Sequence, residues 1–305
     1  PDPLNRQSVD KIMETGIRSI DGFTTIGKGQ RMGIFAGSGV GKSVLLSILA
    51  KQSKADVNVI ALIGERGREV KEFIDKNLGE EGLKKSVIIV STSDQAPMLR
   101  LKAALTATAI SEYFRDQGKD VMFMMDSLTR VAMAQREIGL AVGEPPTTKG
   151  YTPSVFSLLP KIIERAGNGT VGSITGLYTI LIEGDDLDDP IGDTSRSLLD
   201  GHIVLSRKLA SMGHYPPVDV LNSISRLAND IISDGHKDQK KKILSLLSAY
   251  KENEDLISVG AYEEGSNTLI DEAIKAKESI SDFLIQDMND STDFHYMQNE
   301  MNKLA

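Results

Sequence analysis

Short apolar runs alternate with helix-length amphipathic stretches through most of the chain. The apolar runs predict buried strands at Arg31–Phe35, Val57–Ile63, Ser86–Val90, Val121–Met125, Ser173–Ile182 and His202–Leu205. The stretches between them predict helices at Val44–Gln52, Glu69–Asn77, Met98–Gln117, Ser127–Leu140 and Ser154–Arg165. Strands that are apolar throughout and joined by helices are typical of a mostly parallel sheet covered on both faces. In such sheets ligands bind at the carboxyl ends of the strands.

The pattern changes after about Arg226. Four later segments combine helical periodicity with many charges, at Asp238–Ser248, Asn253–Val259, Asn267–Phe283 and Asp293–Leu304. Apolar residues of the third segment fall on one helical face, which indicates a packed amphipathic helix. The basic run Lys237–Lys242 is interpreted as a solvated helix start. We therefore expect an α/β domain over residues 1–226 and an all-helical domain over residues 227–305.

Composition narrows the classes of protein to consider. The 305 residues are 40% hydrophobic and 26% charged, which is typical of a soluble globular protein, and no apolar run approaches the roughly 18–20 residues that span a bilayer. The absence of cysteine excludes disulfides and thiolate metal sites and fits a cytoplasmic protein. A net charge of −8 argues against a nucleic-acid partner. The four histidines lack the spacing of metal ligands, so we interpret them as structural.

A glycine-rich segment joins the first predicted strand to the first predicted helix. Residues 36–43 read Ala-Gly-Ser-Gly-Val-Gly-Lys-Ser, the pattern of a phosphate-binding loop, with Ala36 in place of the usual first glycine. Glycines let backbone N–H groups converge on phosphate oxygens, and the helix N-terminus adds partial positive charge. The alternative is a glycine-rich turn with a surface lysine. We expect a bound nucleoside triphosphate whose contacts are Gly37, Ser38, Gly39, Val40, Gly41, Lys42, Ser43 and Val44.

Two residues of this loop have distinct expected roles. Lys42 contacts the β- and γ-phosphates, and the hydroxyl of Ser43 binds Mg²⁺. Asp126 ends the predicted strand Val121–Met125, where we expect its carboxylate to lie beside Ser43 and to hold Mg²⁺ through water. The alternative is that Asp126 caps the helix that follows it.

A charged segment follows the predicted strand Val57–Ile63. Residues 64–69 read Gly-Glu-Arg-Gly-Arg-Glu. Glu65 could polarise a water molecule for attack on phosphorus, and the adjacent guanidinium of Arg66 could stabilise charge on the phosphate oxygens. A surface cluster of salt bridges would explain the same spacing, and the residues alone do not separate the two interpretations.

Several longer segments carry a family resemblance. The segments 64–70, 125–130, 132–137, 143–156 and 200–226 are similar to the catalytic core of rotary ATP synthase β subunits. Two of these sequences resemble more closely the ATPases of flagellar export and of type III secretion. They are Gly-Glu-Pro-Pro-Thr-Thr-Lys-Gly-Tyr and Ala-Gln-Arg-Glu. The resemblance runs from about Asn5 to the C-terminus, and it implies an α/β, RecA-like P-loop NTPase core with a mostly parallel sheet and a C-terminal all-helical domain.

The resemblance also implies residue roles. It makes Glu65 the water-activating carboxylate, Arg66 a phosphate contact, Asp126 the Mg²⁺-associated aspartate and Arg130 a supporting arginine. Arg226 matches the arginine that reaches in trans into a neighbouring subunit's active site, although an ordinary intramolecular ion pair is the alternative. The resemblance further places the adenine pocket near Leu181 and the turn 260–262.

Function and partners follow as expectations from the same resemblance. They are ATP hydrolysis with Mg²⁺ in a homohexameric ring, coupled to delivering and unfolding flagellar export substrates. The virulence injectisome ATPase is the close alternative. Expected partners are an export-gate membrane protein, central-stalk and regulatory stalk proteins, and export chaperone–substrate complexes. The site of action would be cytoplasmic, at the base of the export apparatus, with only peripheral membrane association and no nucleic acid.

Three other functions share this nucleotide fold. A ring helicase of the transcription-termination type would need a nucleic-acid path, a non-catalytic synthase subunit would lack the glutamate found at Glu65, and a synthase catalytic subunit would lack the export spellings. Family members also carry an N-terminal β-barrel and a flexible leader, whereas this sequence begins Pro-Asp-Pro. We therefore expect this chain to be largely monomeric and weakly active, because Arg226 would have no neighbour to serve.

Overall fold

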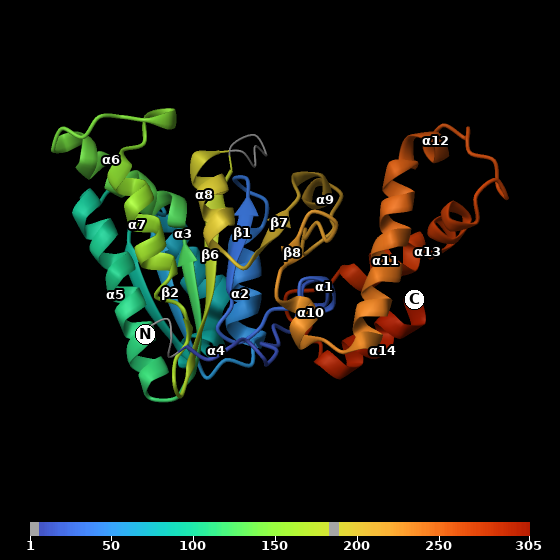
Figure 1. The fold of residues 1–305 in the computed structure, drawn as a ribbon, viewed down its shortest axis with the longest axis horizontal. Coiled ribbons are helices and arrows are strands. Elements are labelled where there is room, and N and C mark those ends of the chain that lie inside the picture. The colour runs from blue at the N-terminus through green and yellow to red at the C-terminus, as the bar shows by residue number, and fades with distance from the viewer. Residues whose placement is uncertain (1–5, 183–188) are drawn as a thin grey trace.

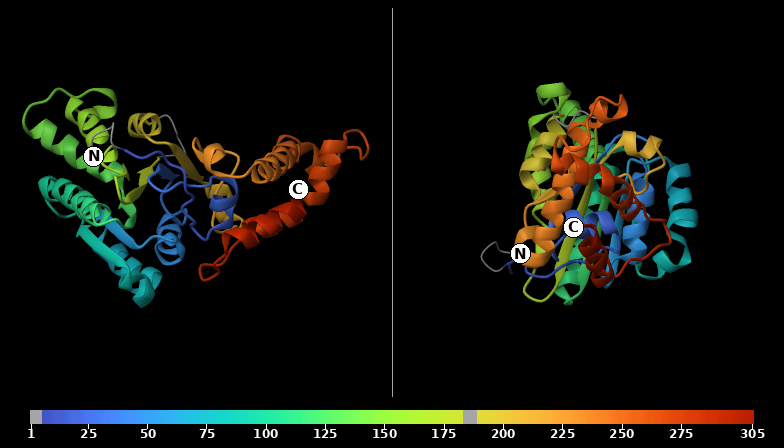
Figure 2. Two further views of the ribbon diagram at one scale, coloured as in Figure 1. Left: turned by 60° about the horizontal axis from the view of Figure 1, so that its bottom comes forward. Right: turned by 90° about the vertical axis from the view of Figure 1, so that its right-hand side faces the viewer.

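A sheet flanked by helices and a separate helical lobe make up the molecule (Figure 1). The computed structural model describes residues 6–182 and 189–305. The helices after residue 233 extend to one side of the sheet, and Figure 2 shows the same arrangement from two further directions. Among the described residues, no helix combines the length and the apolar character needed to cross a membrane.

The sheet is mostly parallel, as expected. Across the described residues it has eight strands in the order β3-β2-β4-β6-β1-β7-β8, with β5 paired to β6. The strands are β1 (Arg31–Ala36), β2 (Val57–Ile63), β3 (Ser86–Ser91), β4 (Asp120–Asp126), β5 (Gly167–Asn168), β6 (Ser173–Leu181), β7 (Gly201–Leu205) and β8 (Ile224–Ser225). Among these strands of the described residues, only the pairings β5·β6 and β7·β8 are antiparallel. The six predicted strands are present with small shifts at their ends, and the two-residue strands β5 and β8 were not predicted.

The predicted helices are also present, together with short ones that the pattern did not reveal. The helices are α1 (Arg18–Phe23), α2 (Lys42–Gln52), α3 (Gly67–Glu72), α4 (Gly79–Lys84), α5 (Pro97–Asp116), α6 (Leu128–Ala141), α7 (Pro153–Ile163), α8 (Pro190–Leu198), α9 (Arg207–Ser211), α10 (Ala228–Ile231), α11 (Asp234–Glu252), α12 (Glu254–Ser258), α13 (Thr268–Leu284) and α14 (Phe294–Leu304). A π-helical turn, η2 (Phe73–Leu78), joins α3 to α4, and a 3₁₀ turn, η3 (Thr148–Gly150), precedes α7.

One helix boundary differs from the prediction. The basic run Lys237–Lys242 lies inside α11, which begins at Asp234 with the hydroxyl of Ser233 accepting the N–H of His236. Lys240 is partly buried there, and burial lowers its pKa. The run therefore lies in the first turns of α11, close to the predicted helix start, and its Lys237 and Lys240 are partly buried. The reason is that Ser233 supplies a better N-cap than the lysines do.

Apolar side chains cover both faces of the sheet, which explains why the strands read as continuous apolar runs. Residues such as Phe35, Val59, Phe123 and Tyr178 belong to one buried cluster, together with residues of α5, α6, α7 and α8. Their strand neighbours, including Ile34 and Ile60, belong to a second cluster with α2 and the helices of the C-terminal lobe.

The C-terminal lobe is attached to the sheet region through α1. Phe23 of α1 meets Phe283 of α13 edge-to-face, with ring centroids 6.3 Å apart. A Cβ on Gly22 would lie 2.9 Å from the sulfur of Met301 in α14, so the Met301 side chain would have to shift to accept a larger residue there. The core of the lobe thus continues into α1. The predicted boundary between two domains at residues 226 and 227 remains a prediction.

Candidate active site

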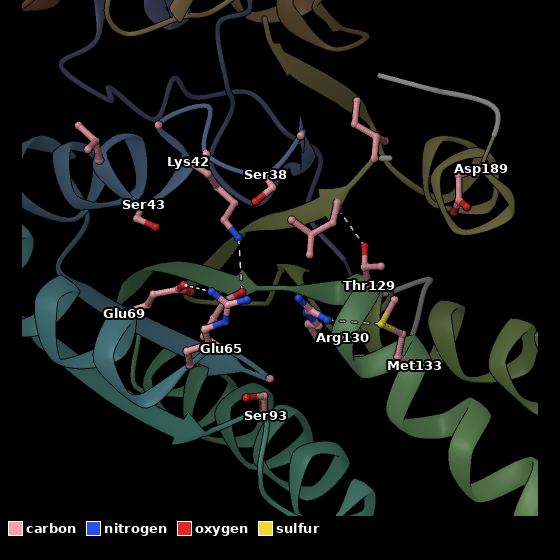
Figure 3. A pocket seen from close by; sticks show the side chains of 18 of the residues that line it. Ser38, Lys42, Ser43, Glu65, Glu69, Ser93, Thr129, Arg130, Met133 and Asp189 are labelled. Atoms are coloured by element: carbon pink, nitrogen blue, oxygen red, sulfur yellow. Dashed lines mark hydrogen bonds and ion pairs between the residues drawn. The ribbon is translucent and has the colours of Figure 1, made fainter. Parts of the chain in front are cut away.

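A cavity of about 660 Å³ opens at the carboxyl edge of the sheet. Its lining comes from the phosphate loop and the start of α2, the loop after β2, helix α6 and the end of β6 (Figure 3). Of the eight expected nucleotide contacts, all except Val40 line it. Glu65, Arg66 and Arg130 also line the cavity. Asp126 lies behind Lys42, and Arg226 lies elsewhere.

The phosphate loop joins β1 to α2 and leaves the first turn of that helix uncapped. Gly41 is the N-cap residue with φ of 93°, a left-handed conformation that favours glycine, and no side chain caps the helix. The N–H groups at the start of α2 therefore face the cavity without a side-chain partner, which is the arrangement that binds phosphate. A Cβ on Gly41 would lie 3.4 Å from the ring of Tyr215.

Lys42 lies between two carboxylates. Its Nζ is 2.5 Å from Oδ1 of Asp126 and 3.5 Å from Oε1 of Glu65. Burial alone would lower the pKa of Lys42, but the charges of Asp126 and Glu65 outweigh burial and hold this pKa above its ordinary value. The lysine is therefore an ammonium at neutral pH, with its charge shared between two anions.

Asp126 is buried at the end of β4, only 3% exposed. Besides Lys42, the hydroxyl of Thr179 on the adjacent strand β6 donates to its Oδ1 at 2.8 Å. The capping alternative considered for Asp126 is wrong, because the N-cap of α6 is Ser127, whose hydroxyl oxygen accepts the N–H of Arg130 at 3.3 Å. The carboxylate of Asp126 is thus available for the cavity's own chemistry.

Glu65 follows β2 and reaches toward Lys42 across the cavity (Figure 3). Burial is the largest influence on the pKa of Glu65 and raises it. The positive charges of Lys42 and Arg130 lower this pKa, whereas the negative charge of Asp126 raises it further. The net result is a raised pKa. The N–H of Ser93 donates to the carbonyl of Glu65 at 3.0 Å and fixes the loop. A carboxyl group with a raised pKa at the wall of a cavity suits a general base.

The two arginines near Glu65 differ in their surroundings. Arg130 lies against Gly64, whose φ is 74° and where an added Cβ would come within 2.8 Å of the arginine's own Cβ. Its Nε is buried and makes no hydrogen bond within the described residues. Arg66 is 79% exposed and pairs with Glu69 at 3.5 Å. The salt-bridge alternative therefore describes Arg66 in this structure, although Arg66 also lines the cavity.

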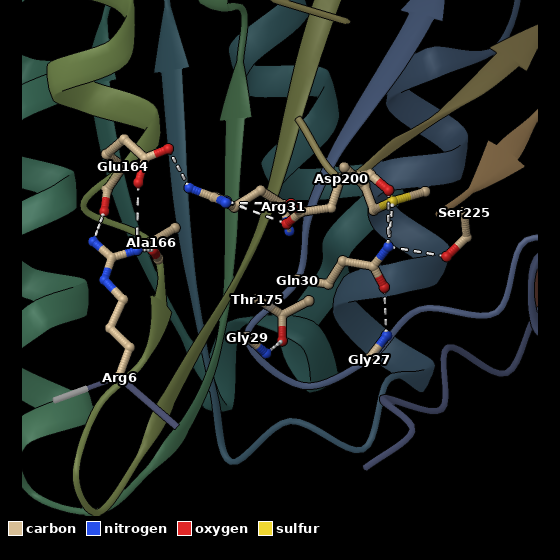
Figure 4. Close-up of polar contacts among 11 residues, drawn as sticks. Arg6, Gly27, Gly29, Gln30, Arg31, Glu164, Ala166, Thr175, Asp200 and Ser225 are labelled. Atoms are coloured by element: carbon tan, nitrogen blue, oxygen red, sulfur yellow. Dashed lines mark hydrogen bonds and ion pairs between the residues drawn. The ribbon is translucent and has the colours of Figure 1, made fainter. Parts of the chain in front are cut away.

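Arg226 lies at the opposite edge of the sheet. It follows β8, and its backbone N–H donates to the carbonyl of Asp200 with N and O 2.9 Å apart, while its Nη2 donates to the carbonyl of Arg196 at 3.2 Å. Asp200 in turn bonds Arg31, the first residue of β1 (Figure 4). The phosphate loop starts beyond the other end of β1, roughly 16 Å away at about 3.3 Å per residue. The chain does not bring Arg226 to its own cavity.

The expected adenine pocket is only partly at the cavity. Leu181 lines it. Tyr262 instead lies in the C-terminal lobe, where its hydroxyl contacts the carbonyl of Asn267 at 3.0 Å and Asp271 at 2.8 Å. Tyr215, which lies beside Gly41, was missed, although an aromatic residue in a proline-flanked loop is a usable signal.

Thr179 was also missed. It is a single hydroxyl near the carboxyl end of an otherwise apolar strand, and the pattern alone does not show that β6 lies next to β4.

The geometry of this edge is suited to holding phosphate, so fold and cavity together define a P-loop nucleotide-binding protein. Residues 16–225 match the model of the ATP synthase alpha/beta family, nucleotide-binding domain. Residues 232–303 match the model of the T3SS EscN ATPase C-terminal domain. The chain belongs to the ATP synthase alpha/beta family, and the resemblance found in its motifs is confirmed.

Individual relatives agree with these matches. A flagellum-specific ATP synthase of Bacillus subtilis (strain 168) is 60% identical over 286 residues, which cover 94% of this chain and 65% of that protein. The structure of an ATPase from the type III secretion system of pathogenic bacteria superposes with a TM-score of 0.94 at 49% identity, covering 100% of this chain and 88% of the other. The assembled ATPase EscN of enteropathogenic E. coli, in complex with its central stalk EscO, gives 0.93 at 48% identity, covering 100% and 73%. The chain thus spans just under two thirds of the first curated relative's length.

Proposed function

We propose that the whole protein hydrolyses ATP to energise type III protein export, delivering and unfolding flagellar export substrates. The observation that carries this proposal is the position of Lys42, an ammonium held between Asp126 and Glu65 at the uncapped start of α2. A cation beside free backbone N–H groups binds phosphate, and a carboxyl group with a raised pKa beside that cation can accept a proton.

The residues divide the hydrolysis between them. The backbone N–H groups of residues 37–44 and the ammonium of Lys42 hold the β- and γ-phosphates. Glu65 accepts a proton from the attacking water as the water oxygen bonds to the γ-phosphorus and the bond to the ADP oxygen breaks. Arg130 and Arg66 stabilise the negative charge that spreads over the phosphate oxygens. The products are ADP and inorganic phosphate.

The residues present also fit Mg²⁺. Mg²⁺ prefers oxygen ligands and is commonly held by one or two carboxylates with water and substrate phosphates. Ser43 and Asp126 would supply a hydroxyl and a carboxylate, the latter through water. When bound, Mg²⁺ neutralises charge on the phosphates.

Assembly completes the site in this proposal. Arg226 is exposed at the amino edge of the sheet and too far from its own cavity to act there. We assign it to the cavity of a neighbouring copy in a homohexamer. The assembled form of the relative EscN supports this arrangement.

The cellular role is proposed from the relatives. The 60% identity to a flagellum-specific ATP synthase favours flagellar export, and the match of residues 232–303 to a type III secretion domain keeps the injectisome as the second candidate. Partners would be an export-gate membrane protein, central and regulatory stalk proteins, and chaperone–substrate complexes. Action would be cytoplasmic at the base of the export apparatus, with residues 1–226 as the ATPase domain and residues 227–305 as the helical domain.

Nucleotide binding and hydrolysis test the proposal. Calorimetry of the full-length protein with Mg²⁺ and ADP is expected to show binding, and Lys42→Ala is expected to lose both affinity and ATP turnover. Lys119→Ala, at an exposed lysine before β4, serves as the control and should behave like the wild type. Wild-type protein that neither binds the nucleotide nor hydrolyses ATP would overturn the assignment.

A further inference from the structure

We infer that Thr179 is a positioning residue: it keeps the carboxylate of Asp126 oriented when the side chain of Lys42 moves toward the phosphates of a bound nucleotide. This inference rests on the function proposed above. Thr179 touches none of the reacting groups in that mechanism and would act only through the carboxylate that it bonds.

The sheet brings the two side chains together. Strands β4 and β6 are adjacent and parallel, and Met125 is paired with Tyr178. The next residues along the two strands, Asp126 and Thr179, therefore lie side by side on the same face. Thr179 is fully buried, and its hydroxyl is 2.8 Å from Oδ1 of Asp126 and 3.3 Å from the carbonyl of Met125.

Both side-chain hydrogen bonds that Asp126 makes within the described residues go to Oδ1. One comes from Lys42 at 2.5 Å and the other from Thr179. The carboxylate's second oxygen is left for the water-mediated contact with Mg²⁺ proposed above. The two donors therefore determine how the carboxylate is turned.

The two donors differ in how firmly they are held. Lys42 reaches Asp126 through a long flexible side chain and is drawn to the phosphates when nucleotide binds. Thr179 has a single χ1 angle, restricted by its β-branched side chain, on a strand buried between two neighbours. When Lys42 moves, the hydroxyl of Thr179 keeps Oδ1 bonded, so that the buried carboxylate retains a partner and its orientation.

Within the sheet itself the hydroxyl makes only the longer contact of 3.3 Å to the carbonyl of Met125, among the described residues. Valine has nearly the same shape, is favoured in strands and would fill the same space without the hydrogen bond. A purely structural site would therefore accept valine.

The test compares the full-length wild type with Thr179→Val and Thr179→Ser. The first readout needs no turnover: equilibrium binding of a fluorescent ADP analogue, titrated with Mg²⁺ and repeated in EDTA. The second readout is the Mg²⁺ concentration that gives half-maximal ATP hydrolysis. We expect Thr179→Val to raise the Mg²⁺ requirement about tenfold in both, the usual size of an outer-shell effect, with unchanged binding in EDTA. Thr179→Ser should restore wild-type values.

A matched control removes a buried hydroxyl elsewhere. Thr108 of α5 donates to the carbonyl of Ala104 in its own helix at 2.9 Å, and Thr108→Val should leave the Mg²⁺ requirement unchanged. If Thr179→Val does not fold, Thr179→Ala against Thr179→Ser isolates the hydroxyl, because both lack the methyl group. Equal Mg²⁺ requirements with and without the hydroxyl would overturn the inference. Wild-type protein that binds no nucleotide would instead overturn the proposed function.

Discussion

The two edges of the sheet use the same kinds of charged residues in different ways. At the amino edge, Arg31 donates hydrogen bonds to both Asp200 and Glu164 (Figure 4). At the same edge Lys28 pairs with Asp120, which also accepts the hydroxyl of Ser173. At the carboxyl edge Lys42 lies between two carboxylates, Asp126 and Glu65, beside an open cavity.

The difference appears in the pKa values of the carboxyl groups. At the amino edge, burial would raise the pKa of Asp120, but hydrogen bonds from Lys28 and Ser173 outweigh it and lower the pKa. At the carboxyl edge, burial raises the pKa of Glu65, and Lys42 offsets it only partly. Charges that are matched within the chain stabilise the fold, whereas Glu65, whose burial is only partly offset, is left ready to accept a proton.

Substitution of Arg226 should cause the largest loss of ATP turnover. This residue is the exception to the comparison, because it lies at the amino edge of the sheet but is assigned to catalysis. In the assembled full-length protein, Arg226→Ala should lower ATP turnover by roughly 10³–10⁵, the range for an arginine supplied in trans. ATPase assays across a concentration series, with light scattering to follow assembly, measure this. An equal loss in isolated monomers would mean that the arginine acts within its own chain.

Glu65→Gln probes the carboxyl edge alone. Glutamine keeps the shape but cannot accept the proton, so turnover should fall by roughly 10²–10⁴ while nucleotide affinity remains. Steady-state assays and equilibrium binding separate the two. Glu72→Gln, an exposed glutamate of α3 paired only with Lys76 among the described residues, is the control. Unchanged turnover in Glu65→Gln would remove this residue from the mechanism.

Asp200→Asn probes the amino edge. The substitution removes the negative charge that accepts hydrogen bonds from both the backbone N–H and the guanidinium of Arg31. The free energy of unfolding should therefore fall by about 1–3 kcal/mol, toward the lower end because the pair is partly exposed to solvent. Denaturant unfolding measures this change. Turnover per folded molecule should stay the same, and a selective loss of turnover would contradict the division between the edges.

The smallest effect is in titration. NMR of the side-chain carboxyl carbons should find Asp120 titrating below its ordinary 3.8 and Glu65 above its ordinary 4.5. The contribution of ionised Asp120 to the free energy of unfolding is then lost as the pH falls through its lowered pKa. The contribution of protonated Glu65 is instead lost as the pH rises through its raised pKa. Shifts of the same sign at both residues would contradict the contrast.

Much of this could be predicted from the sequence because the signals are local. Buried parallel strands read as apolar runs, and the spelling of residues 36–43 identifies the phosphate loop. Asp126 and Glu65 could be singled out because each lies within two residues of the end of a predicted strand. The strand order was not available, since β6 lies between β4 and β1 and only the folded sheet brings Thr179 to Asp126. The same holds for Tyr215, which reaches Gly41 from a distant loop.

Gln286, at the base of the C-terminal lobe, has a consequence for motion. Its backbone N–H donates to the carbonyl of Tyr215 at 2.8 Å, and its side-chain amide donates to the carbonyl of Gly16 at 2.7 Å and accepts the N–H of Arg18 at 2.9 Å. Tyr215 borders the glycine turn that receives phosphate, and Gly16 and Arg18 begin the stretch that leads into β1. A movement of the lobe would therefore be transmitted through Gln286 both to Tyr215, beside the phosphate loop, and to the segment that leads into β1.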